Sequence, residues 1–99
     1  MTETTEQVRT LADGMREAVS SYRDGRLPLD RLVWELKSRI AALQGVADQE
    51  WVEELRSAWW QLESVNAFWI ESGRAELTDD ERREVDEGLD ELLPMLVAY

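Results

Sequence analysis

Residues 48–73 read DQEWVEELRSAWWQLESVNAFWIESG, and their large apolar side chains recur every three or four positions. This spacing is typical of one face of an amphipathic helix. Asp48 is suited to the N-cap, and the acids that follow it lie near the positive end of the helix dipole. Ser72-Gly73 ends the segment. The predicted inward stripe, which includes one asparagine, consists of Trp51, Leu55, Ala58, Trp59, Leu62, Val65, Asn66 and Trp69.

Three further segments repeat the helical spacing, and no segment alternates apolar and polar residues as a strand does. Gly25 is expected to end the first helix in the left-handed conformation, and Gly45 to stop the second. Gly14 lies inside the first helix and weakens it slightly. The predicted helices cover about residues 4–23, 29–44, 48–72 and 78–98. Four amphipathic helices with short loops predict an all-α, compact four-helix up-down bundle, as a single domain over residues 1–99.

The last predicted helix carries two boundary signals. Thr78-Asp-Asp-Glu81 has the pattern of a capping box, in which the Thr78 hydroxyl and the Glu81 carboxylate each accept a backbone N–H of the other residue. Pro94 removes an amide donor and clashes with the carbonyl four residues earlier. We therefore expect a kink or a stop near Leu93.

The composition argues against catalysis. The chain has no cysteine and no histidine, which excludes disulfides, thiolate zinc sites and a cysteine nucleophile, and removes the commonest general base and transition-metal ligand. The many carboxylates lie off the apolar stripes, and no glycine-rich phosphate loop is present. We expect a protein that is not an enzyme and that has no metal or cofactor.

The negative charge is gathered in the second half of the chain. The net charge is −11; residues 1–45 carry seven acids and seven bases, whereas residues 46–99 carry fifteen acids and four bases. Such a field repels nucleic acid and anionic lipid and attracts basic protein surfaces. No stretch approaches the ~20 apolar residues of a membrane span, and the first residues do not resemble a signal peptide. We expect a cytoplasmic protein with no nucleic-acid or membrane partner.

Two tryptophans lie off the apolar stripes. At 100° per residue, Trp60 points away from Trp51 and Trp69, and Trp34 lies beside Lys37, outside the stripe of its own helix. Each could pack sideways against a neighbouring helix or loop. Each could instead be an interface anchor, because exposed tryptophan among polar groups is typical of a binding hot spot.

Short motifs over residues 20–93 match a known pattern. They include Tyr22-Arg-Asp-Gly-Arg26, Ser57-Ala-Trp59, and Gly73-Arg74 ahead of Leu77-Thr-Asp-Asp-Glu81. Together they resemble small helical immunity proteins of bacterial polymorphic or contact-dependent growth inhibition toxin systems. Trp60 and Asn66 depart from that pattern, which has a small residue and an aromatic residue there. The resemblance implies an inhibitor that binds and neutralises a cognate toxin domain.

Many such toxin domains are nucleases with basic clefts, which an acidic inhibitor can reach quickly. We therefore predict binding through an acidic, tryptophan-containing helical surface, as a monomer that forms a 1:1 complex. Trp60 is the predicted anchor, and Trp34 is a second anchor if the interface spans the second helix. The alternative is a non-catalytic homodimeric adaptor. The predicted partner-binding residues are Trp60, Glu53, Glu63, Glu71, Trp34, Asp80, Glu84, Glu87 and Glu91.

Overall fold

The computed structural model describes the backbone of residues 2–97 and the side chains of residues 5–97. The described chain is helical and contains no strand. The predicted all-α four-helix fold is confirmed, with boundaries within two residues of those expected; residue 98, the predicted end of the last helix, lies outside the described part. The helices are α1 (Thr2–Arg23), α2 (Leu29–Leu43), α3 (Gln49–Ser72) and α4 (Asp79–Val97).

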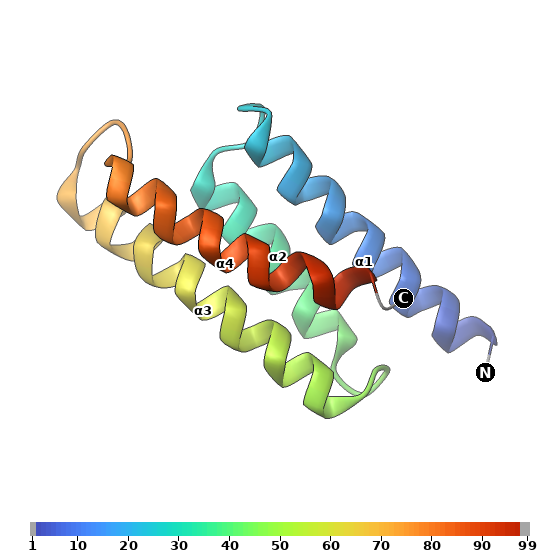
Figure 1. The fold of residues 1–99 in the computed structure, drawn as a ribbon. Helices are drawn as coiled ribbons and strands as arrows, with labels where there is room; N and C mark the ends of the chain where they lie inside the picture. Colours follow the sequence, from blue (N-terminus) through green and yellow to red (C-terminus); the bar gives the residue numbers. More distant parts are fainter. Residues whose placement is uncertain (1, 98–99) are drawn as a thin grey trace.

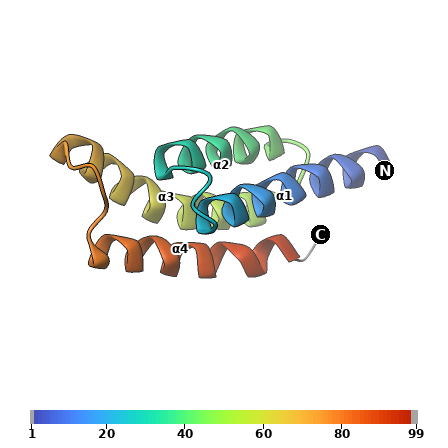
Figure 2. The same cartoon turned by 90° about the horizontal axis from the view of Figure 1, so that it is seen from above.

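The four helices form an up-down bundle in which successive helices run in opposite directions (Figure 1). α1 and α3 each pack against both α2 and α4. α2 and α4 therefore lie on opposite sides of the bundle, with the other two helices between them (Figure 2). α3, like α1, is therefore flanked by α2 on one side and by α4 on the other.

Every helix contributes apolar side chains to one core. The completely buried residues include Met15 of α1, Leu36 of α2, Leu62 of α3 and Leu92 of α4. Each buried side chain of this size contributes roughly 1.5–3 kcal/mol relative to exposure. The apolar stripes predicted from the helical spacing are the surfaces that meet in this core.

Local capping begins and ends the helices largely as predicted. The Asp48 carboxylate accepts the Trp51 backbone N–H at 3.2 Å. Gly25 and Gly45 adopt φ of 79° and 80°, conformations that favour glycine. The capping box is present as well: the Glu81 N–H donates to the Thr78 hydroxyl at 3.1 Å, and the Thr78 N–H donates to the Glu81 carboxylate at 2.8 Å.

Of the kink or stop expected near Leu93, the stop does not occur, because α4 continues through Pro94 to Val97. Because Pro94 lies in the last turn, it removes the helical donor of only one carbonyl, that of Asp90. The carbonyls after Pro94 lack helical donors because the helix ends, and side chains from two other helices satisfy two of them. The Trp51 indole N–H donates to the Met95 carbonyl at 3.1 Å, and the Arg16 guanidinium donates to the Leu96 carbonyl at 2.8 Å. The cation also complements the negative end of the helix dipole.

Two glycines lie where helices approach closely. A Cβ on Gly88 of α4 would lie 2.8 Å from Cδ2 of the buried Leu62 side chain of α3. A Cβ on Gly14 of α1 would overlap the guanidinium of Arg39, which crosses from α2. Gly14 therefore makes room for an arginine from another helix, a role that its position in the sequence does not reveal.

Candidate protein-binding surface

The five tryptophans divide into buried and exposed side chains. Trp59 is only 6% exposed, and its indole N–H donates to the Val33 carbonyl of α2 at 2.9 Å. Trp51 and Trp69 are partly buried and pack against the core. In contrast, Trp60 is 55% exposed and Trp34 is 58% exposed. Neither of these two is buried against a neighbouring helix, so both present a large aromatic surface to solvent.

A groove of about 350 Å³ lies beside Trp60, between α2 and α3. The Trp59 and Trp60 rings meet in an edge-on arrangement, with ring centroids 5.0 Å apart and planes at 64°. Both cations that line the groove, Lys37 and Arg56, lack an ion-pair partner among the described side chains. We call it the tryptophan groove; its lining residues are Lys37, Ile40, Ala41, Arg56, Trp59 and Trp60.

The three acids predicted to bind the partner together with Trp60 lie at different distances from it along α3, and Glu63, three residues further on, is its neighbour on the helix surface. Glu53 and Glu71 are exposed and lie within ~20° of Trp60 around α3. At 1.5 Å per residue, however, they are ~10 Å and ~16 Å away along the helix. Glu63 is half-buried and lies on the side of α3 that carries Arg56, about two turns further along. A partner must span ~27 Å of α3 to touch Glu53, Trp60 and Glu71 together.

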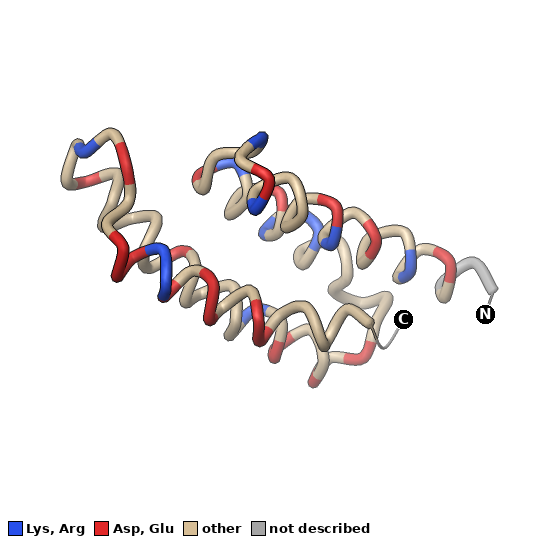
Figure 3. The backbone as a smooth tube through the Cα atoms, turned by 45° about the horizontal axis from the view of Figure 1, so that its top comes forward, with Lys and Arg blue, Asp and Glu red and all other residues tan. Residues whose placement is uncertain are grey.

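The four acids predicted on the last helix form a separate group. They are exposed and lie within ~60° of one another around α4, opposite its buried stripe. Figure 3 shows acidic residues along this helix up to its C-terminal turns, which carry none. Only the first of them forms an ion pair within the described chain, with Arg83 at 3.5 Å. We call this group the acidic stripe; it consists of Asp80, Glu84, Glu87 and Glu91.

The structure therefore divides the predicted partner-binding residues between two sides of the bundle. Trp34 lies on α2 and the acidic stripe on α4, and these helices are on opposite sides (Figure 2). Trp60 lies on α3, between them. A partner that covers the outer surface of α3 could reach part of either group, whereas Trp34 and the whole stripe do not share one face.

Sequence reasoning missed several residues of this surface. Phe68 and Ile70 of α3 are 64% and 58% exposed. The helical spacing that singled out Trp60 would also have placed both off the inward stripe. Lys37 was recognised only as a neighbour of Trp34. That it joins Arg56 beside Trp60 depends on how α2 and α3 align, and no local signal reports this.

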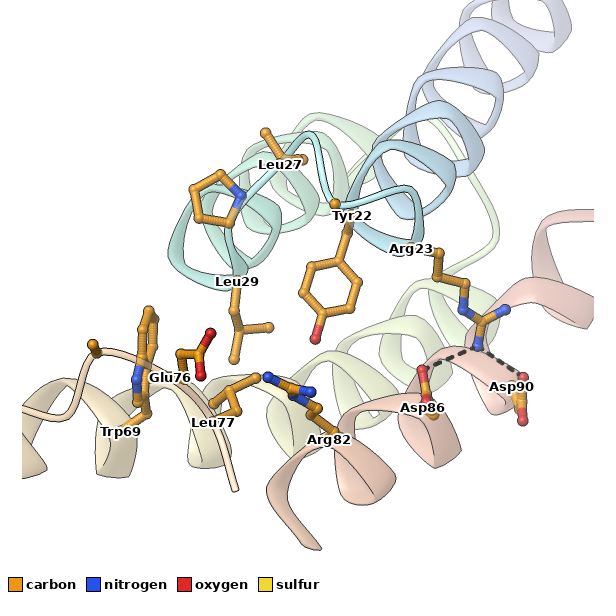
Figure 4. A pocket seen from close by; sticks show the side chains of 13 residues that line it. Tyr22, Arg23, Leu27, Leu29, Trp69, Glu76, Leu77, Arg82, Asp86 and Asp90 are labelled. Carbon is orange, nitrogen blue, oxygen red and sulfur yellow. Dashed lines mark hydrogen bonds and ion pairs between the residues drawn. The ribbon is translucent and has the colours of Figure 1, made fainter. Parts of the chain in front are cut away.

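A cavity of about 910 Å³ opens at one end of the bundle between the α1–α2 and α3–α4 loops. Tyr22, Leu29 and Trp69 are among its walls (Figure 4). Arg23 of α1 reaches across to α4, where it pairs with Asp90 at 3.0 Å and Asp86 at 3.7 Å. Burial, and then the nearby Asp86 carboxylate, raise the pKa of the Tyr22 phenol. The cavity's two α4 carboxylates are thus engaged in holding α1 to α4.

One acid of α4 has a structural role. Arg74, in the loop after α3, makes two hydrogen bonds of 2.8 Å to the two carboxylate oxygens of Glu81. These bonds, together with the capping contact to Thr78, lower the pKa of Glu81 to about 2. Glu81 therefore stabilises the fold through these contacts, unlike the acids of the exposed stripe.

Comparisons with protein families, with curated proteins and with solved structures find no match for this chain. Within the described residues, no group of three or more acids is arranged to hold a metal ion, and no helix is long and apolar enough to cross a membrane. The geometry of the exposed surface is therefore the main guide to function.

Proposed function

We propose that this chain is a non-catalytic inhibitor that binds a cognate bacterial toxin domain on the outer surface of α3, with Trp60 as the apolar anchor. The observation that carries the proposal is the exposure of Trp60 beside a groove, next to a tryptophan that is 6% exposed. Solvent contact with a large aromatic side chain is unfavourable, and such residues concentrate at interfaces. Covering about 100 Å² of its ring would contribute ~2 kcal/mol.

The acidic stripe supports a basic partner. Glu84, Glu87 and Glu91 make no ion pairs with other described side chains, so their field acts outward. A field of this kind raises the association rate with a basic surface such as the cleft of a nuclease. That the partner is a toxin domain is what the resemblance to immunity proteins implies. The proposal places the inhibitor in the cytoplasm, where an incoming nuclease domain meets its substrate.

A homodimeric adaptor is the competing hypothesis, and charge argues against it. A two-fold interface uses the same patch on both copies. An interface centred on the tryptophan groove would bring Lys37 and Arg56 of one copy to the same cations of the other, without an acid in the groove lining to offset them. We therefore expect the isolated chain to be monomeric by light scattering and to form a 1:1 complex with the toxin domain.

The test is a growth-rescue and binding experiment with the toxin domain encoded by the adjacent open reading frame. The wild-type chain is expected to rescue growth and to bind the purified domain. Trp60→Ala should weaken binding at least ~30-fold, corresponding to ~2 kcal/mol, and reduce rescue. Failure of the wild-type chain to bind or to rescue would contradict the proposal, as would full activity of Trp60→Ala.

The same experiment separates steering from contact by using charge-matched variants. Glu87→Gln/Glu91→Gln removes two charges from the acidic stripe, and Glu6→Gln/Glu17→Gln removes two exposed charges from α1. The α4 variant should associate several-fold more slowly at low salt than the α1 variant, and the difference should shrink at high salt. Equal rates for the two variants would mean that the stripe does not steer the partner.

A further inference from the structure

We propose that the tryptophan groove binds an acidic segment of the partner, which inserts an apolar side chain between α2 and α3 and pairs its Asp or Glu carboxylates with Lys37 and Arg56. This inference rests on the proposed function only in assuming that a protein docks on α3. The groove would bind a negatively charged segment, whereas the acidic stripe would attract a positively charged surface.

The charge of the groove is opposite to that of the chain. The chain has 22 acids and 11 bases, yet the groove is lined by two cations and four apolar residues, without an acid. Six arginines elsewhere in the described chain form ion pairs, whereas Lys37 and Arg56, like Arg9, Arg31 and Arg82, form none. Both donors are thus available to a carboxylate, and the arginine can bind one through two parallel hydrogen bonds.

The shape of the groove fits one apolar side chain. Ile40 and Ala41 contribute from α2, and Trp59 and Trp60 contribute from α3. The buried Ile40 and the hydrogen-bonded Trp59 are held by the core, so these parts are formed before a ligand arrives and little ordering is needed on binding. A volume of about 350 Å³ lies at the small end of the range for ligand sites. The small side chain of Ala41, which is exposed, keeps the groove open.

A second aromatic contact extends the basic character along α2. The Arg31 guanidinium lies over the ring of Trp34, 5.7 Å from its centroid, a cation–π arrangement. Trp34 and Lys37 are one turn apart on the exposed side of α2. An acidic segment that leaves the groove toward α2 would meet a further cation there, whereas toward α4 it would meet the acidic stripe. The segment is therefore expected to run over α2.

The inference is tested with synthetic peptides, which do not require the natural partner. The acidic probe is an acetylated 14-residue helical peptide built from Leu-Glu-Glu-Leu-Leu-Glu-Glu repeats. The basic probe has Lys at every Glu position, and the apolar-deficient probe has Ala at every Leu position. Binding is followed by the NMR signal of the Trp60 indole N–H and by backbone amide shifts. We expect the acidic probe to shift Trp60 and residues 37–41, and the apolar-deficient probe to bind at least tenfold more weakly.

Charge reversal provides the decisive variant. Lys37→Glu/Arg56→Glu should weaken the acidic probe at least tenfold and should allow the basic probe to shift Trp60. The matched control, Arg9→Glu/Arg83→Glu, reverses two cations outside the groove and should leave the acidic probe unaffected. Ala41→Tyr fills the groove and should also weaken the acidic probe. Melting curves establish that each variant is folded.

Several results would overturn the inference. The first is an acidic probe that leaves the Trp60 signal unchanged, and the second is unchanged binding after charge reversal in a folded variant. The third is self-association of the wild-type chain that the reversal abolishes, because the ligand would then be a second copy. If the wild-type chain fails to bind the toxin domain while the peptide results hold, the proposed function fails and the assignment of the groove stands.

Discussion

The interfaces on the two sides of α3 are built differently. On the α2 side, the Trp59 indole fills the space between the helices and hydrogen-bonds to Val33, and the surface above it stays open as the tryptophan groove. On the α4 side, Gly88 lets the helices approach so closely that a single added carbon would collide with Leu62. The Arg74–Glu81 pair then joins the loop after α3 to the first turn of α4.

This difference indicates how a small bundle can support a binding surface. A close interface with α4 fixes the position of α3, so the other side of the same helix can leave a groove without making the helix mobile. Sites carried by rigid elements hold their geometry better than sites on loops. The exposed stripe on α4 adds charge and needs no groove, since steering depends on the field rather than on close contact.

The largest effect is expected at the α2–α3 interface. Trp59→Ala should lower the free energy of unfolding by about 3–5 kcal/mol, because it removes a buried indole and leaves a cavity. Trp60→Ala, the adjacent matched change, should lower it by less than about 1 kcal/mol, since over half of that side chain is already exposed. Urea denaturation followed by circular dichroism measures both. If the two variants lose similar free energy of unfolding, Trp59 does not contribute more than Trp60 to the packing of α2 against α3.

A smaller effect is expected at the α3–α4 interface. Gly88→Ala should cost about 1–3 kcal/mol through overpacking against Leu62, against a gain of about 1 kcal/mol in helix propensity. We expect a net loss of stability and a fall in Tm.

Gly14→Ala is the matched control for that variant. Its new Cβ displaces only the flexible end of Arg39, whose ion pair with Glu35 is a loose 3.7 Å contact. Such a pair contributes roughly 0.3–0.5 kcal/mol, less than the gain of about 1 kcal/mol in helix propensity. Gly14→Ala is therefore expected to stabilise the protein slightly. If Gly88→Ala and Gly14→Ala lower the stability equally, the loss in Gly88→Ala does not come from the close approach of α3 and α4.

The sequence alone predicts what short-range physics determines. The helical spacing predicted the helices and the difference between Trp59 and its neighbour, and a four-residue motif predicted the capping box at Thr78, because each depends on residues within a few turns. Long-range contacts escaped it. The stop weighed near Leu93 does not occur, and Arg16 and Trp51, far away in the sequence, donate to the last carbonyls of α4.

The candidate site was less predictable than the fold. Trp60 could be recognised from its own helix, but the cations beside it could not, because Lys37 comes from α2 and its place depends on how two helices align. The acids predicted beside Trp60 came from its own helix: Glu63 lies one turn from it, whereas Glu53 and Glu71 lie two and three turns away along α3. Residue type and helical angle are local properties, whereas the composition of a groove is not.

The smallest expected effect distinguishes the structural acid of α4 from the exposed stripe. The folded-state pKa of Glu81 is lowered from 4.5 to about 2, so the unfolded chain takes up its proton at higher pH than the folded chain. The stability gained from ionised Glu81 is therefore fully present above pH 4.5 and is lost as pH falls from 4.5 toward 2. Glu81→Gln should flatten the dependence of unfolding free energy on pH in this window.

A double-mutant cycle with Arg74→Gln tests the cause of that pH dependence. The side-chain hydrogen bonds from Arg74 are the main cause of the lowered pKa of Glu81, so Arg74→Gln should flatten the pH dependence in the wild-type chain. In the Glu81→Gln background the same change should leave the slope unaltered, because the titrating carboxyl is gone. Unfolding curves at pH 2.5, 3.5, 4.5 and 7 measure the slopes. If Arg74→Gln changes the pH dependence of the unfolding free energy equally in both backgrounds, the effect does not come from the Arg74–Glu81 ion pair.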